Sequence, residues 1–190
     1  MEYWNEYIKK ARDCGYKFVS WNVWNRSGSG GSVGAITALF PIEHEFIFIF
    51  CKEVHKDDIN KTKINKHAGQ HRSGGDRQKD GSLIHKNRKI NPNRRLGTVQ
   101  TIDFERNIEY KQLHPAVFPI QLPAEFISAI LNEDMICIDP FLGAGTTLIA
   151  CEQLNRICYG MELDLIYCDV IIQRWEKFTG QKAHLQEVSS

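Results

Sequence analysis

The sequence predicts an α/β fold, in which helices pack on a parallel sheet. The C-terminal third alternates apolar helices and strands, a pattern that is typical of parallel sheets with helical crossovers. Two closely spaced glycines separate one of those strands from the next helix, as in a ligand-binding turn. With 190 residues, 42% of them hydrophobic, the chain is long enough for one domain with a buried core.

The N-terminal part predicts one helix and two strands. Residues 3–14 carry apolar side chains at helical spacing, and Gly15 ends that helix. Residues 16–24 are rich in aromatic and β-branched residues, which favours a strand, and residues 45–51 predict a second, strongly apolar strand. A Gly/Ser loop at 27–34 lies between the two strands.

The C-terminal elements follow one another with short turns between them. Helices are predicted at 123–131, 146–154 and 165–178, and strands at 135–139 and 157–162. We expect the last helix to face the core with a stripe of four side chains, Tyr167, Val170, Ile171 and Trp175.

The middle of the chain is strongly basic. Residues 55–97 hold twelve of the 24 Lys and Arg but only four of the 23 Asp and Glu, and this surplus is concealed by the overall net charge of +1. Because apolar residues are sparse there, the segment cannot build its own core, and we expect a loop-rich insertion. The charge indicates a polyanionic partner, although a solvated loop would have the same composition.

Membrane spans, disulfides and metal sites are not expected. No apolar run approaches the roughly 20 residues that a membrane span needs, and the polar N-terminus is unlike a secretory signal. The six cysteines form no Cys-x-x-Cys pair, and the histidines of the basic segment match no zinc-binding spacing. These features favour the cytoplasm, and we expect no metal ion.

The strongest functional motif is the segment 139–147, DPFLGAGTT, between a predicted strand and a predicted helix. Gly143 and Gly145 let the backbone approach a ligand, and the helix N-terminus supplies free N–H groups. Glu162 ends the next strand, nineteen residues after Gly143, where a carboxylate can accept hydrogen bonds from ribose hydroxyls. The combination indicates a nucleotide-like ligand.

The same motif favours S-adenosylmethionine over a dinucleotide. Leu148 stands where the dinucleotide pattern G-x-G-x-x-G has its third glycine. Asp139, directly before the loop, would repel a pyrophosphate and suits a ligand with a positive centre and an amino group. S-adenosylmethionine has both, and it has no phosphate.

These residues resemble the DNA amino-methyltransferases that modify adenine N6 or cytosine N4. DPFLGAGTT resembles their cofactor loop, and residues 114–119 (HPAVFP) resemble the segment that covers the methionine end of the cofactor. Residues 160–183 are similar to the C-terminal ending of prophage-type members. Residues 19–25 and 44–50 resemble the two strands that follow the catalytic motif, so the cofactor half lies C-terminal, in the permuted order of this family.

The resemblance implies a single Rossmann-like, S-adenosylmethionine-dependent methyltransferase domain, incomplete at its N-terminus. Residues 1–54 would be the remainder of the catalytic half, 55–112 a basic target-recognition insert, and 113–190 the cofactor-binding half. The expected cofactor-binding residues are His114, Pro115, Phe118, Asp139, Pro140, Phe141, Gly143, Gly145, Thr146, Thr147 and Glu162. The expected contacts to double-stranded DNA are Arg72, Arg77, Arg88, Arg94 and Arg95.

The catalytic motif of the family is absent from the sequence. It consists of Asp, Asn or Ser, then Pro-Pro and an aromatic residue, and it should precede residue 16, but no two of the six prolines are adjacent. In the family, this motif orients the amino group of a flipped base toward the methyl donor. We therefore expect no catalytic residue in this chain and no activity from it alone, with the motif supplied by an upstream segment or a second chain.

The expected function is site-specific DNA methylation in a restriction-modification or prophage setting, with adenine slightly favoured over cytosine. The alternatives are a non-catalytic DNA-binding remnant, a partner subunit of a split methyltransferase, or an enzyme that acts on RNA or a small molecule. Trp21 and Trp24 are expected to pack in the sheet rather than stack on a base. His44 is expected to be a hydrogen-bonded residue at the start of a strand.

Overall fold

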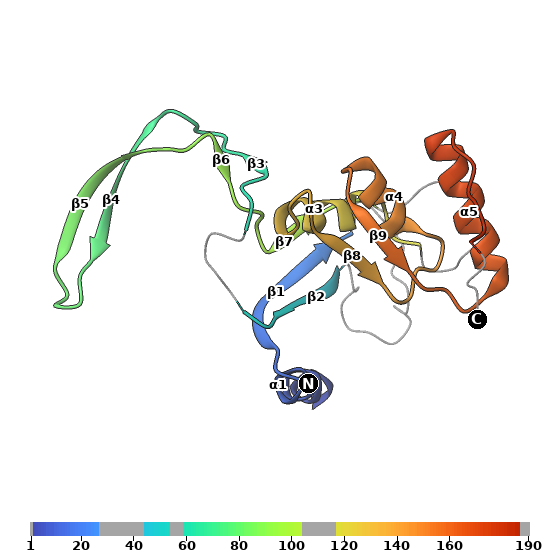
Figure 1. Cartoon of the computed structure of the whole chain (residues 1–190). Coiled ribbons are helices and arrows are strands. Elements are labelled where there is room, and N and C mark those ends of the chain that lie inside the picture. Colours follow the sequence, from blue (N-terminus) through green and yellow to red (C-terminus); the bar gives the residue numbers. More distant parts are fainter. Residues whose placement is uncertain (1, 27–43, 54–58, 104–116, 187–190) are drawn as a thin grey trace, which may run out of the picture.

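The computed structural model describes residues 2–26, 44–53, 59–103 and 117–186 (Figure 1). The elements in chain order are α1 (Glu2–Asp13), β1 (Lys17–Asn25), β2 (His44–Cys51), β3 (Lys63–Ile64), β4 (His71–Arg77), β5 (Leu83–Lys89), β6 (Asn93–Arg94), β7 (Val99–Thr101), α3 (Gln121–Ile130), β8 (Ile136–Asp139), α4 (Thr146–Gln153), β9 (Ile157–Gly160) and α5 (Leu165–Thr179). The helices and strands predicted at the two ends of the chain are confirmed to within two residues. None of the described helices is both long and apolar enough to cross a membrane.

The first sheet has the strand order β2-β1-β7. β1 is antiparallel to β2, from Lys17 opposite Cys51 to Asn25 opposite His44, and parallel to β7. The Trp24 side chain is buried, and its indole N–H donates to the Ile102 carbonyl oxygen over 2.8 Å. The ring of Trp21 contacts Phe46 and Phe48 but stays 44% exposed, so Trp24 packs in the sheet as expected and Trp21 does so only in part.

The second sheet consists of the parallel strands β8 and β9, with Cys137 opposite Cys158. One face of this pair lies against a core cluster formed by α3 and α4, which includes Ile127, Ala150 and Cys151. The other face is open, because four apolar side chains are 51–68% exposed: Ile136, Ile138, Ile157 and Tyr159. Parallel sheets are normally covered on both faces, so this open face is unusual for its class.

The basic segment contains strands that the sequence did not predict. β4 and β5 form an antiparallel hairpin that extends away from the rest of the molecule as a curved ribbon (Figure 1). Both strands are exposed almost throughout, so they lack the apolar alternation from which a strand is predicted. At the base of the segment, the Asn60 side chain donates to the Ser128 carbonyl oxygen over 3.1 Å, and Lys63 forms an ion pair with Glu125 on α3.

Candidate functional site

The turn between β8 and α4 depends on two glycines in the left-handed region of φ. Gly143 has a φ of 54° and Gly145 a φ of 77°, values that residues other than glycine rarely adopt. Gly145 caps α4, and a Cβ atom placed on it would lie 3.2 Å from Cγ1 of Ile171 on α5. Glycine is therefore needed at position 145 both for the backbone and for the close approach of α5.

The Glu162 carboxylate fastens this turn to the end of β9. Oε2 accepts the N–H of Gly143 over 2.8 Å, and Oε1 accepts the N–H groups of Leu163 and Asp164, each over 3.0 Å. Backbone bonds from Met161 to Asp139 and from Leu142 to Met161 join the same two strand ends. Glu162 thus lies beside the glycine turn, and a ribose would share oxygens that already hold the loop.

The buried Arg174 supports the loop from beneath, a role that the sequence did not predict. Nη1 of Arg174 on α5 donates to the Ala144 carbonyl oxygen over 2.8 Å and to the Thr146 hydroxyl over 3.1 Å. Thr146, expected to face the cofactor, is itself buried and bonded to this guanidinium. Arg174 follows Val170 and Ile171 at helical spacing. Its position in the apolar stripe was therefore the sequence signal that could have predicted a buried arginine.

The remaining predicted cofactor residues have different environments. Asp139 accepts the Phe141 N–H over 3.0 Å, and the Phe141 ring is 88% exposed. Pro140 is exposed and Thr147 is half-buried. Phe118 packs against the core cluster of Trp24, Ile102 and Leu122. His114 and Pro115 lie outside the described residues. The structure therefore brings together Asp139, Gly143, Gly145 and Glu162 at the carboxyl ends of β8 and β9.

Three thiols lie together beneath this sheet. The sulfur atoms of Cys137, Cys151 and Cys158 are within 4.8 Å of one another, and they come from β8, α4 and β9. Burial raises the pKa of the Cys151 thiol, and burial together with the neighbouring Cys137 raises the pKa of the Cys158 thiol to about 11. Without a metal ion, the thiols of Cys151 and Cys158 are therefore protonated at neutral pH and pack as small apolar groups. Sequence spacing did not reveal this cluster, because three separate elements contribute to it.

The predicted DNA-contacting arginines lie along the basic segment and are exposed. Arg72 on β4 stands directly opposite Arg88 on β5, and Arg77 ends β4. Arg94 and Arg95 lie at the base of the segment, in and just after β6. Like charges directly opposite each other repel, so the opposed Arg72 and Arg88 suit a surface that binds an anion.

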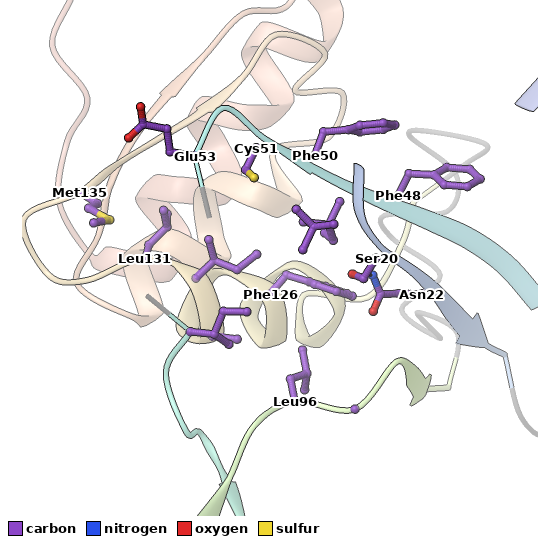
Figure 2. Close-up of a pocket in the computed structure, with 16 residues that line it drawn as sticks. Ser20, Asn22, Phe48, Phe50, Cys51, Glu53, Leu96, Phe126, Leu131 and Met135 are labelled. Atoms are coloured by element: carbon purple, nitrogen blue, oxygen red, sulfur yellow. The ribbon is translucent and has the colours of Figure 1, made fainter. Parts of the chain in front are cut away.

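A cavity of about 500 Å³ lies between the β1–β2 ladder and α3 (Figure 2). Its lining is mostly apolar, with Phe48, Phe126 and Leu131 among the contributors. The polar side chains are those of Ser20, Asn22 and Glu53, and Asn22 Nδ2 already donates to Ser20 Oγ over 2.9 Å. No sequence pattern indicated this cavity, because the residues that form its walls are distant from one another in the chain.

Comparison with known families finds one family model, described as DNA methylase, which matches residues 1–174. Among curated proteins, the Type II methyltransferase M.HpaI of Haemophilus parainfluenzae is 27% identical over 177 residues, which cover 92% of this chain and 51% of that protein. The orphan methyltransferase M.BamHII of Bacillus amyloliquefaciens is 38% identical over 65 residues, or 34% of this chain and 24% of that protein. The chain thus spans about half of the length of M.HpaI and about a quarter of the length of M.BamHII.

Solved structures show the same fold. The M1.HpyAVI–SAM complex superposes with a TM-score of 0.63 at 22% identity, covering 92% of this chain and 71% of that one. The PvuII DNA methyltransferase, described as cytosine-N4-specific, also gives 0.63, at 17% identity, with 93% and 60% covered. The predicted Rossmann-like methyltransferase fold is confirmed by these likenesses.

Proposed function

The chain belongs to the DNA methylase family, and on that premise we propose that it is the cofactor-binding and DNA-binding part of a site-specific DNA methyltransferase. The observation that carries the proposal is the glycine turn fastened by Glu162 at the carboxyl ends of β8 and β9. Ligands of open α/β sheets bind at that edge of the sheet. S-adenosylmethionine would supply the methyl group, attached to its sulfonium.

The residues at this edge suit the parts of that cofactor. Glu162 lies where ribose hydroxyls can donate to a carboxylate, and Asp139 offers a negative charge to the sulfonium and the α-amino group. The exposed Phe141 ring provides an apolar surface next to the loop. Arg174 holds the loop in place through Ala144, so that the site exists before the cofactor arrives.

We further propose that a segment outside these residues supplies the groups that orient the acceptor base. Two features of the described residues support this. The open face of β8–β9 exposes apolar side chains that a parallel sheet normally covers. The cavity in Figure 2 is apolar, and a flipped base needs hydrogen bonds to its Watson–Crick edge, so the cavity suits a chain segment better than a base.

The proposed organisation is a single domain in three parts: residues 1–54 from the catalytic half, 55–112 as the target-recognition insert, and 113–190 as the cofactor half. Adenine N6 is slightly favoured over cytosine N4 as the target. A partner subunit of a split methyltransferase is the second candidate, and the open apolar face favours it. The basic segment argues against a small-molecule substrate.

Titration calorimetry with S-adenosylmethionine tests the cofactor site directly. The chain is expected to bind the cofactor or its demethylated product, and Gly145→Val is expected to abolish the heat of binding. Gly180→Val is a matched control, since Gly180 also has a positive φ but caps the far end of α5. Absence of binding to the folded wild-type chain would remove the cofactor assignment.

A further inference from the structure

The β4–β5 hairpin has two faces of different character. Residues directly opposite each other in an antiparallel pair share a face, so Arg72 with Arg88 and Gly74 with Lys86 lie on one side. We call this side the groove face. Ser73 with Asn87 and Gly75 with His85 lie on the other side.

The groove face is hollowed and cationic. A shallow groove on it is lined by the side chains of Arg72, Asp76, Lys86 and Arg88, among others, and by the backbone of Gly74 and of the neighbouring Gly75. Asp76 accepts from Arg88 and lies 3.4 Å from the Lys86 ammonium. These ion pairs gather the two cations at the groove. Its lining holds four cations, Arg72, Lys86, Arg88 and Lys89, against the one carboxylate of Asp76.

The two adjacent glycines of β4 have different reasons to be glycine. A Cβ atom on Gly75 would lie 3.2 Å from the Leu83 side chain, so internal packing restricts that position. A Cβ atom on Gly74 would meet nothing within 4 Å. Glycine inside a strand weakens it and often marks a place where a ligand approaches the backbone closely. Among the described residues nothing fills the space above Gly74, so this space is open to an external group.

We propose that this groove binds one phosphodiester group of the backbone of double-stranded DNA, with Arg72, Lys86 and Arg88 as its cationic walls and Gly74 as its floor. This inference rests on the proposed function, which makes DNA the substrate. A phosphodiester is a compact anion, and guanidinium groups bind its oxygens with paired hydrogen bonds. Arg88 is already paired with Asp76, and an anion between the opposed Arg72 and Arg88 would attract both guanidinium groups.

The shape of the hairpin favours DNA over double-stranded RNA. The major groove of B-form DNA admits a two-stranded β-ribbon. The major groove of an A-form RNA helix is deep and narrow, and side chains do not reach into it. In Figure 1 the β4–β5 ribbon is separated from the body of the molecule, so a duplex can approach it without meeting the sheets.

The test uses the whole chain and a mixed-sequence DNA duplex, with binding followed by fluorescence anisotropy over a range of salt concentrations. Gly74→Val fills the groove with a strand-forming side chain, and we expect it to weaken binding at least tenfold. Ser73→Val is the matched control, because it places the same side chain on the neighbouring residue of the opposite face. We expect it to change the affinity less than twofold.

A double variant measures how many phosphates the groove contacts. If Arg72 and Arg88 share one phosphate, the double variant Arg72→Ala/Arg88→Ala should reduce the slope of log affinity against log salt by about one. A reduction near two would mean two separate phosphates and would overturn the shared site. Equal weakening by Gly74→Val and Ser73→Val, or none by either, would overturn it as well.

Failure of this inference is distinguishable from failure of the proposed function. If the chain binds duplex DNA and Gly74→Val does not matter, the groove assignment is wrong while DNA remains the partner. If duplex RNA of the same length competes as well as DNA, the duplex DNA assignment of the groove is wrong. If the chain binds no nucleic acid and calorimetry detects no heat of S-adenosylmethionine binding, the proposed function itself is wrong.

Discussion

The cofactor loop and the β4–β5 hairpin are built by opposite means. The loop from Asp139 to Thr146 is held by the Glu162 carboxylate and by the buried guanidinium of Arg174. The hairpin has no core beneath it, and its side chains are exposed on both faces. One region has its geometry fixed by buried contacts before a ligand arrives, and the other presents charge on a ribbon that backbone ladder bonds and exposed ion pairs of Asp76 maintain.

The difference shows what each region can do. A loop whose N–H and C=O groups are already bonded can place a methyl donor within a fraction of an ångström. A ribbon with six Lys and Arg between His71 and Lys89, against two Asp, gains affinity from counterion release, which tolerates loose geometry. Substitutions should therefore affect folding and cofactor binding in the loop, and salt-dependent binding in the hairpin.

The same substitution in the two regions should give the largest contrast. Gly145→Val should destabilise the fold by roughly 2–5 kcal/mol, from about 1–2 for left-handed backbone and about 1–3 for crowding of Ile171. Gly74→Val should leave stability unchanged or raise it by about 0.5–1 kcal/mol, because the position is open and Val favours strands. Urea unfolding measures both, and equal losses of stability would contradict the comparison.

Removal of the carboxylate that fastens the loop should come next in size. Glu162→Ala leaves the N–H of Gly143 without its acceptor and should cost about 1–3 kcal/mol of cofactor binding. Glu162→Gln keeps one carbonyl oxygen as an acceptor and should lose less. Calorimetry compares the two, and an unchanged affinity in Glu162→Ala would contradict the ribose assignment.

Charge removal at the base of the hairpin segment should have a smaller effect that depends on salt. Arg94→Ala/Arg95→Ala should flatten the slope of log affinity against log salt for duplex DNA by about one to two. The control is Lys10→Ala/Arg12→Ala, which removes two exposed cations from the last turn of α1, away from the hairpin (Figure 1). Equal slopes in both double variants would show that the charge of the segment does not contribute specifically to DNA binding.

The smallest expected effect is a loss of stability at alkaline pH from the thiol cluster. Burial raises the pKa of Cys158 to about 11 from an ordinary 9.0, so the folded state holds its proton more tightly than the unfolded state. Stability is then full below pH 9 and falls as the pH rises from 9 toward 11. Cys158→Ala should flatten this fall in thermal unfolding, whereas Cys14→Ala, at an exposed position, should not.

The elements that pack against a core were predictable from the sequence, and the hairpin was not. α5 shows its apolar stripe at helical spacing, and β2 is apolar without interruption from Phe46 to Cys51, so packing against a core leaves its pattern in the sequence. β4, with the sequence HRSGGDR, buries neither face, so no periodicity marks it. Its register comes instead from the turn and from backbone pairing with β5.

The candidate site was predictable where a residue type has a local reason. Gly143 and Gly145 are recognisable because the strand–glycine–helix order requires a backbone that only glycine adopts easily. Arg174 and the three clustered thiols were missed, since their partners lie in other elements and only the folded chain brings them together. Phe118 was placed at the site by resemblance, and its contact with the Trp24 cluster depends on tertiary packing.

Transfer of a labelled methyl group from S-adenosylmethionine to mixed-sequence duplex DNA tests the central claim most directly. The 190 residues alone should transfer none, because orientation of the acceptor can supply about 7–11 kcal/mol of a barrier and no Pro-Pro-aromatic motif is present in the sequence. Addition of a polypeptide that carries the Pro-Pro-aromatic motif, fused or separate, should restore transfer. Clear incorporation by the chain alone would contradict the account and would make Trp21, Trp24 and His44 the first candidates for an acceptor site.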